Sequence, residues 1–71
     1  MKYEVMLGFN TKQWWVYNND TDMYCDPPAH ILDQVKQHSP DINAQQAYLE
    51  NIVATNPDWL QDPNAQYNEI E

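Results

Sequence analysis

An antiparallel pair of strands is predicted by residues 3–17, which read YEVMLGFNTKQWWVY. Between residues 3 and 9, large apolar side chains alternate with polar or smaller ones, and this period of two is typical of a strand with one apolar face. Residues 14–17 are aromatic or β-branched on both faces, which favours a second strand whose two sides are at least partly covered. The short connection between the two segments predicts a hairpin.

Residues 18–22, which read NNDTD, are typical of a turn. Asn and Asp side chains accept hydrogen bonds from their own backbone, and this stabilises a reversal of the chain. The next three residues, Met23, Tyr24 and Cys25, then predict a short third strand before the first proline pair.

From residue 26 onward the pattern becomes helical. Four prolines each follow a residue that caps helices, and proline in the first helical position loses nothing by lacking an amide hydrogen. The pairs are Asp26-Pro27, Ser39-Pro40, Asn56-Pro57 and Asp62-Pro63. Their spacing predicts a helix over 27–38, a longer helix over 41–55, and short helical turns with a tail over 57–71.

Both predicted long helices carry an apolar face. The first face comprises Ile31, Leu32, Val35 and His38, and the second comprises Ile42, Leu49, Ile52 and Val53, with Tyr48 at its edge. We therefore expect one α+β domain over residues 1–71, in which an antiparallel β-hairpin, extended by the third strand, occupies 1–25 and packs against two or three C-terminal helices. The tail is expected to be a turn pinned by Tyr67 and Ile70, or to have no fixed structure.

The charge balance restricts what the protein binds. Eleven Asp and Glu residues stand against three lysines and no arginine, which gives a formal net charge of −8, and no lysine follows Lys36. Nucleic-acid binding depends on cations that displace counterions, so direct contact with nucleic acid is not expected. A single glycine, Gly8, cannot build a phosphate-binding loop. An acidic surface is also repelled by anionic lipid, so no membrane contact is expected.

The location that the sequence indicates is a reducing cytoplasm. Cys25 is the only cysteine and cannot form an internal disulfide, and Glu4 lies where an apolar signal core would begin. No apolar run approaches the roughly 20 residues of a membrane span. Small acidic proteins of this kind are typical of bacteriophages and other mobile elements, an expectation about class that no single residue carries.

The candidate metal and catalytic patterns are incomplete. Asn18, Asp20 and Asp22 alternate as at the start of a calcium loop, but that loop's glycine and bidentate glutamate positions hold Met23 and Ala29. The spacing of Cys25, His30 and His38 does not give paired zinc ligands. Acidic neighbours raise the pKa of a cysteine and so oppose its use as a nucleophile. We therefore expect no metal site, no cofactor and no enzymatic activity.

Residues from Trp14 through Pro28 loosely resemble a WW domain. The shared features are paired aromatics, an Asn-containing turn, a Thr, a later aromatic residue and a closing proline. The resemblance implies binding of proline-rich peptides. However, Tyr24 or Cys25 stands where the second tryptophan would be, the hairpin is about two residues short, and the helical remainder has no counterpart, so no family is assigned.

The first functional hypothesis is an acidic binding protein that occupies a basic surface of a partner protein, as an inhibitor or a nucleic-acid mimic. Complementary electric fields accelerate association and select partners. The carboxylates expected to contact the partner are Asp20, Asp22, Asp26, Asp58 and Asp62. The opposing interpretation is that a net charge of this size only keeps a small domain in solution.

The second hypothesis is an adaptor or oligomeric subunit, including a homodimer, that binds through exposed aromatic residues of the hairpin. The candidates are Trp14, Trp15 and Tyr17, with Trp59 in addition. Adjacent strand residues point to opposite faces, so one of the two neighbouring tryptophans should be at the surface unless both sheet faces are covered. An exposed tryptophan beside a tyrosine is typical of a binding anchor.

Overall fold

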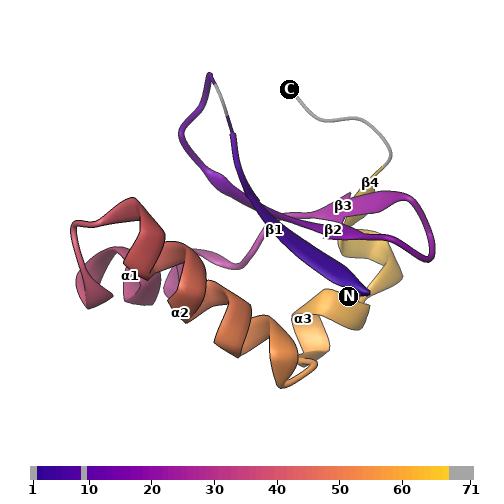
Figure 1. Cartoon of the computed structure of the whole chain (residues 1–71). Helices are drawn as coiled ribbons and strands as arrows, with labels where there is room; N and C mark the ends of the chain where they lie inside the picture. Colours follow the sequence, from indigo (N-terminus) through magenta and orange to yellow (C-terminus); the bar gives the residue numbers. More distant parts are fainter. Residues whose placement is uncertain (1, 9, 68–71) are drawn as a thin grey trace.

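A computed structural model describes residues 2–8 and 10–67 of the chain. The elements run β1 (Tyr3–Leu7), β2 (Trp14–Asn18), β3 (Met23–Cys25), α1 (Ala29–His38), α2 (Ile42–Ala54), α3 (Asp58–Gln61), the 3₁₀ turn η1 (Pro63–Ala65) and β4 (Gln66–Tyr67). The strands form one antiparallel sheet in the order β1-β2-β3-β4, and Figure 1 shows the three α-helices on one side of it. The α+β fold predicted from the sequence is confirmed.

The predicted hairpin has a defined register, with Tyr3 opposite Asn18 and Val5 opposite Val16. The predicted third strand also forms and pairs with β2. The fourth strand was not predicted, because two residues are too few to show a period. Gln66 of β4 pairs with Cys25, so the chain returns to the sheet where a helical turn or a tail was expected. The expected anchor at Ile70 lies outside the described residues.

Two turns hold the strands in register. In the β1–β2 connection, the Gly8 amide donates to the Gln13 carbonyl at 2.6 Å, and a Cβ at Gly8 would lie 2.5 Å from Thr11 Oγ1. Glycine is therefore required there for close approach of the chain. In the β2–β3 turn, Asn18 Oδ1 accepts from the amides of Asp20 and Thr21 at 2.8 and 3.3 Å. This is the side-chain mechanism that the Asn- and Asp-rich sequence predicts.

Only one of the four proline pairs caps as predicted. Asp62 is the N-cap of η1 with Pro63 following it, and its carboxylate accepts from the Asn64 amide at 3.0 Å. The helices α1 and α3 instead begin after an extended proline, Pro28 or Pro57, with no side-chain cap. The cap predicted at Asp26 is displaced because Pro27 precedes a second proline, which disfavours helical geometry before it.

The N-cap of α2 is displaced in the same direction, by two residues, from Ser39 to Asp41. The Asp41 carboxylate accepts from the Ala44 amide at 3.0 Å. The predicted cap, Ser39, contributes indirectly, since its hydroxyl accepts from the Asp41 amide at 3.1 Å. The sequence therefore identified the region of each helix start, but it identified the capping residue only at Asp62.

The core lies between the inner face of the sheet and the helices. Val16, Val35 and Leu49 are at most 1% exposed, and the cluster around them includes Val5, Trp14, Cys25, Ile31, Val53 and Leu60. Two residues assigned to the apolar helix faces are exposed. Ile42 is 47% exposed because burial in α2 begins one turn later, and His38 is exposed at the end of α1, where its ring stacks on Tyr48 with centroids 4.3 Å apart.

One polar side chain completes this core. Gln45 is 9% exposed, accepts from Trp14 Nε1 through Oε1 at 3.3 Å, and donates through Nε2 to the Ser39 carbonyl at 2.7 Å. It thereby joins the sheet, α2 and the α1–α2 connection. None of the helices within the described ranges combines the length and apolar character that crossing a membrane requires.

Candidate protein-binding face

The sheet has one face covered by helices and one that no described helix covers (Figure 1). Val5, Trp14, Val16 and Cys25 point into the helix-covered core. Because side chains alternate along a strand, their neighbours point to the opposite side. We call this side the open sheet face, and it comprises Glu4, Met6, Trp15, Tyr17 and Tyr24. Met6 lies opposite Trp15, and Tyr17 lies opposite both Glu4 and Tyr24.

Three aromatic rings on the open sheet face contact one another in a row. The rings of Tyr17 and Tyr24 are tilted, with centroids 5.0 Å apart, and Trp15 meets Tyr24 edge-on at 6.3 Å. The two tyrosines are partly exposed, and Met6 is 40% exposed. The two tyrosines and the thioether of Met6 therefore give the open sheet face accessible surface of the kind that makes binding anchors.

Trp15 is less accessible than the sequence indicated. Its side chain is 9% exposed although no described helix covers its side of the sheet. Contacts with Tyr24 and the close approach of Gly8, where a Cβ would lie 3.1 Å from the indole, account for part of this cover. Trp14 is 4% exposed in the core and bonded to Gln45. A partner contact through Trp14 is incompatible with this position, and neither tryptophan is the exposed anchor that was expected.

Carboxylates lie at the tyrosine end of the aromatic row. The Tyr17 hydroxyl donates a hydrogen bond to the Asp22 carboxylate. This bond, followed by loss of surrounding water and the charge of Asp22, raises the pKa of Tyr17 to about 12. The nearby Tyr24 hydroxyl and the charge of Glu4 raise the pKa of Tyr17 further, to a smaller extent. Anionic charge is therefore opposed at Tyr17, so this end of the face is suited to a cationic group.

The five predicted acidic contact residues take different positions. Asp20 and Asp22 are exposed in the β2–β3 turn, and Asp22 joins the open sheet face through Tyr17. Asp26 is exposed after β3, Asp58 is the first residue of α3, and Asp62 caps η1. The structure thus brings Asp22 together with one predicted aromatic residue, Tyr17.

Sequence reasoning missed Glu4, Met6 and Tyr24 as members of this face. Their signal is the alternation in residues 3–7 combined with the pairing of β1, β2 and β3. The alternation was visible in the sequence, but the register that places Glu4 beside Tyr17 comes only from the folded sheet.

The cysteine and the candidate metal ligands do not form a reactive centre in the described parts of the chain. Cys25 is buried and free, and burial, reinforced by the charges of Asp26 and Asp62, raises the pKa of its thiol to about 11. Its sulfur lies 3.6 Å from the carbonyl oxygens of Asp26 and Trp59. Across residues 2–8 and 10–67, no three His, Cys, Asp or Glu side chains gather where a metal ion could be held.

No protein-family model, curated protein or solved structure matches the chain.

Proposed function

We propose that this protein is a small acidic binding protein, without catalytic activity, whose open sheet face occupies a basic surface of a partner protein. The observation that supports this most is the row of Trp15, Tyr24 and Tyr17 with Asp22 and Glu4 at its tyrosine end. Such a protein would act as an inhibitor, or would compete with the nucleic acid that the basic surface otherwise binds. It is not expected to contact nucleic acid or a membrane itself.

The chemistry of the face favours lysine or arginine on the partner. A cation above a tyrosine ring is attracted by the ring electrons, with about 0.5–2 kcal/mol depending on exposure. A guanidinium also stacks on aromatic rings and pairs with carboxylates. Tyr17 and Tyr24 provide the rings, and Glu4 and Asp22 provide the carboxylates within the same face. One arginine on the partner could therefore use both kinds of contact.

The whole-molecule charge supports the same kind of partner. A net charge of −8 attracts a basic surface over distances of about 10 Å at moderate salt and accelerates encounter. The alternative function, an adaptor or homodimer formed through the aromatic residues, is favoured by the 40% exposure of Met6. Two copies that meet through this face would, however, bring like charges together, which opposes self-association.

The test uses an oligo-arginine peptide as the probe and follows tyrosine and tryptophan fluorescence. Glu4→Gln removes one exposed carboxylate from the open sheet face, and Asp33→Asn removes one from α1 as a matched control. An exposed charge contact contributes about 0.5–1 kcal/mol, so Glu4→Gln should weaken binding about two- to fivefold. Asp33→Asn should weaken it less, because only the long-range field changes.

Salt provides the second measurement. Raising the salt concentration from about 50 mM to about 500 mM shortens the screening length and should weaken peptide binding steeply. The proposal is refuted if Asp33→Asn weakens binding as much as Glu4→Gln, since the attraction would then be a property of net charge alone. Binding that is unchanged by salt, together with self-association, would favour the aromatic adaptor.

A further inference from the structure

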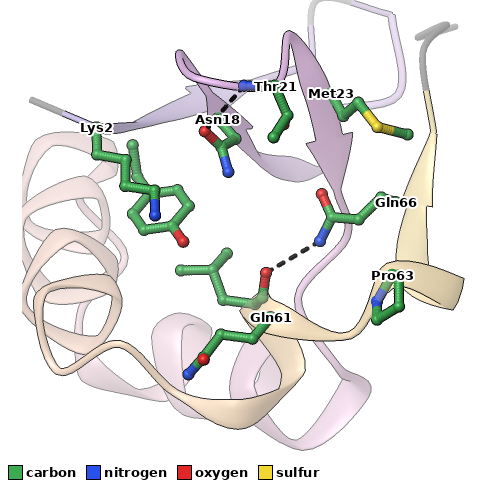
Figure 2. A pocket seen from close by; sticks show the side chains of 9 residues that line it. Lys2, Asn18, Thr21, Met23, Gln61, Pro63 and Gln66 are labelled. Carbon is green, nitrogen blue, oxygen red and sulfur yellow. Dashed lines mark hydrogen bonds between the residues drawn. The ribbon is translucent and has the colours of Figure 1, made fainter.

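A hollow lies on the other side of the sheet, away from the open sheet face. It has a volume of about 340 Å³, within the usual range of small-molecule pockets. Tyr3, Asn18 and Met23 form one wall, and they are successive cross-strand partners at one end of the sheet. Leu60, Gln61 and Pro63 enclose it from α3 and η1 (Figure 2).

The residues that line this pocket carry a different charge from the protein as a whole. Among the described residues, none that lines it is acidic, and Lys2, one of three lysines in the chain, is included. Acidic residues flank it in sequence but are used elsewhere. Asp22, next to Thr21, bonds Tyr17 on the open sheet face, and Asp62, between Gln61 and Pro63, accepts from the Asn64 amide. The pocket is therefore lined without acidic side chains, although the protein as a whole is acidic.

Hydrogen bonds fix which way two carboxamides face. Asn18 Oδ1 accepts from two turn amides, so its Nδ2 group is directed into the pocket, as Figure 2 shows. Gln66 Nε2 donates to the Leu60 carbonyl at 3.0 Å, which leaves its Oε1 as an acceptor on the opposite wall. The Lys2 ammonium, 5.4 Å from the centroid of the Tyr3 ring, adds a cation at the edge. The pocket thus combines donors on one side with an acceptor on the other.

The geometry points to a site for an α-amino acid with an apolar side chain. Its carboxylate would be held by Lys2 and Asn18, and its nitrogen by Gln66 Oε1. Its side chain would contact Met23 and Pro63, beside the buried Leu60. Hydrogen bonds to charged groups are the stronger ones, so the carboxylate contacts dominate. A zwitterion without net charge also suits a protein of charge −8 better than a free anion does.

The test is a titration of isotope-labelled protein with L-leucine, observed through the amide signals of Asn18, Thr21 and Gln66. We expect saturable shifts with a dissociation constant in the range of about 1 mM. L-leucinamide, which lacks the carboxylate, should give no saturable shift at these residues. N-acetyl-L-leucine distinguishes a free amino acid from the carboxyl terminus of a peptide as the ligand. If it binds more tightly than L-leucine, the site is assigned to a peptide carboxyl terminus, and if it binds more weakly, the site is assigned to the free amino acid.

Lys2→Gln should weaken binding of the tighter-binding carboxylate ligand about two- to fivefold, because Lys2 is an exposed charge, whereas Lys36→Gln, which removes an exposed lysine on α1, should leave it unchanged. Lys2 is exposed, so far-UV circular dichroism should show an intact fold. The inference is overturned if neither carboxylate ligand saturates by about 20 mM, if L-leucinamide binds equally well, or if Lys2→Gln has no effect. Glu4→Gln, which alters the open sheet face, should not change leucine binding, so this test can fail independently of the proposed function.

Discussion

Replacing Gln45 by alanine should reduce the free energy of unfolding more than the same change at a glutamine that is not buried. The change removes the acceptor of Trp14 Nε1 and the donor to the Ser39 carbonyl. Trp14 is 4% exposed, so its N–H group would lose its partner without gaining water, at a cost of about 1–3 kcal/mol. Ser39 is half-buried, so water can replace much of the second bond. We expect a total loss of about 2–3 kcal/mol.

This loss is large for a chain of 71 residues. At roughly 0.05–0.15 kcal/mol per residue, the whole free energy of unfolding is about 4–11 kcal/mol. Urea denaturation monitored by circular dichroism measures the change, and Gln46→Ala, at the half-buried neighbouring position of α2, is the matched control.

A double-mutant cycle isolates the hydrogen bond itself. Trp14→Phe removes the indole donor, so Gln45→Leu should cost about 0.5–3 kcal/mol less in that background than in the unaltered protein. If Gln45→Ala costs no more than Gln46→Ala, or if the cycle gives no coupling between Trp14 and Gln45, the hydrogen bond between these two side chains does not stabilise the fold.

Three further predictions concern single groups. Gly8→Ala should reduce the free energy of unfolding by about 1–3 kcal/mol in urea denaturation, because the new Cβ would lie 2.5 Å from a hydroxyl and 3.1 Å from both a carbonyl and an indole ring. Equal stability would show that the loop yields freely. Cys25 should react slowly with a thiol reagent at pH 8, and the rate should rise toward pH 11. Burial of the neutral thiol should contribute its full stability below about pH 9, and this contribution should be lost as the pH rises through about 11. Fast labelling of the folded protein near neutral pH would contradict its burial. In an ultraviolet titration Tyr17 should ionise near pH 12, and Asp22→Asn should move this pKa down toward 10; an unchanged value would show that the hydrogen bond to Asp22 is not its main cause.

Much of the fold follows from local patterns in the sequence. The period of two in residues 3–7 and the aromatic run after residue 13 specify a hairpin, and the Asn-rich turn after it is stabilised by the side chain that the sequence indicates, Asn18. The two long helices lie where the proline spacing predicts them. Each of these signals acts within a few residues, so one sequence is sufficient to identify it.

Features that depend on contacts between distant residues were not predictable. The strand β4 forms because Gln66 pairs with Cys25, which lies forty-one positions earlier in the chain. Gln45 is buried because Trp14 and Ser39 both require a partner, although glutamine is usually a surface residue. The helices α1 and α3 begin later than the sequence predicts because an extended proline, and not the capping residue before a proline, precedes each of them.

The candidate site shows the same division. Tyr17 and Asp22 were identified from the sequence, and the fold brings them together across a turn. The size of Trp14 and Trp15 predicts binding anchors, but the same size makes them useful in the interior of a small protein, where both are buried. Which aromatic residue serves the core and which faces outward is set by strand register, and a shift of one residue would exchange them.

An amide-shift map of the labelled protein with an oligo-arginine peptide tests whether the open sheet face binds a cationic protein surface. We expect saturable shifts to concentrate at Glu4, Met6, Tyr17, Asp22 and Tyr24. Exposed acidic positions on the helices, such as Asp33, should change little. Shifts spread evenly over all exposed carboxylates, or confined to the helices, would contradict this expectation.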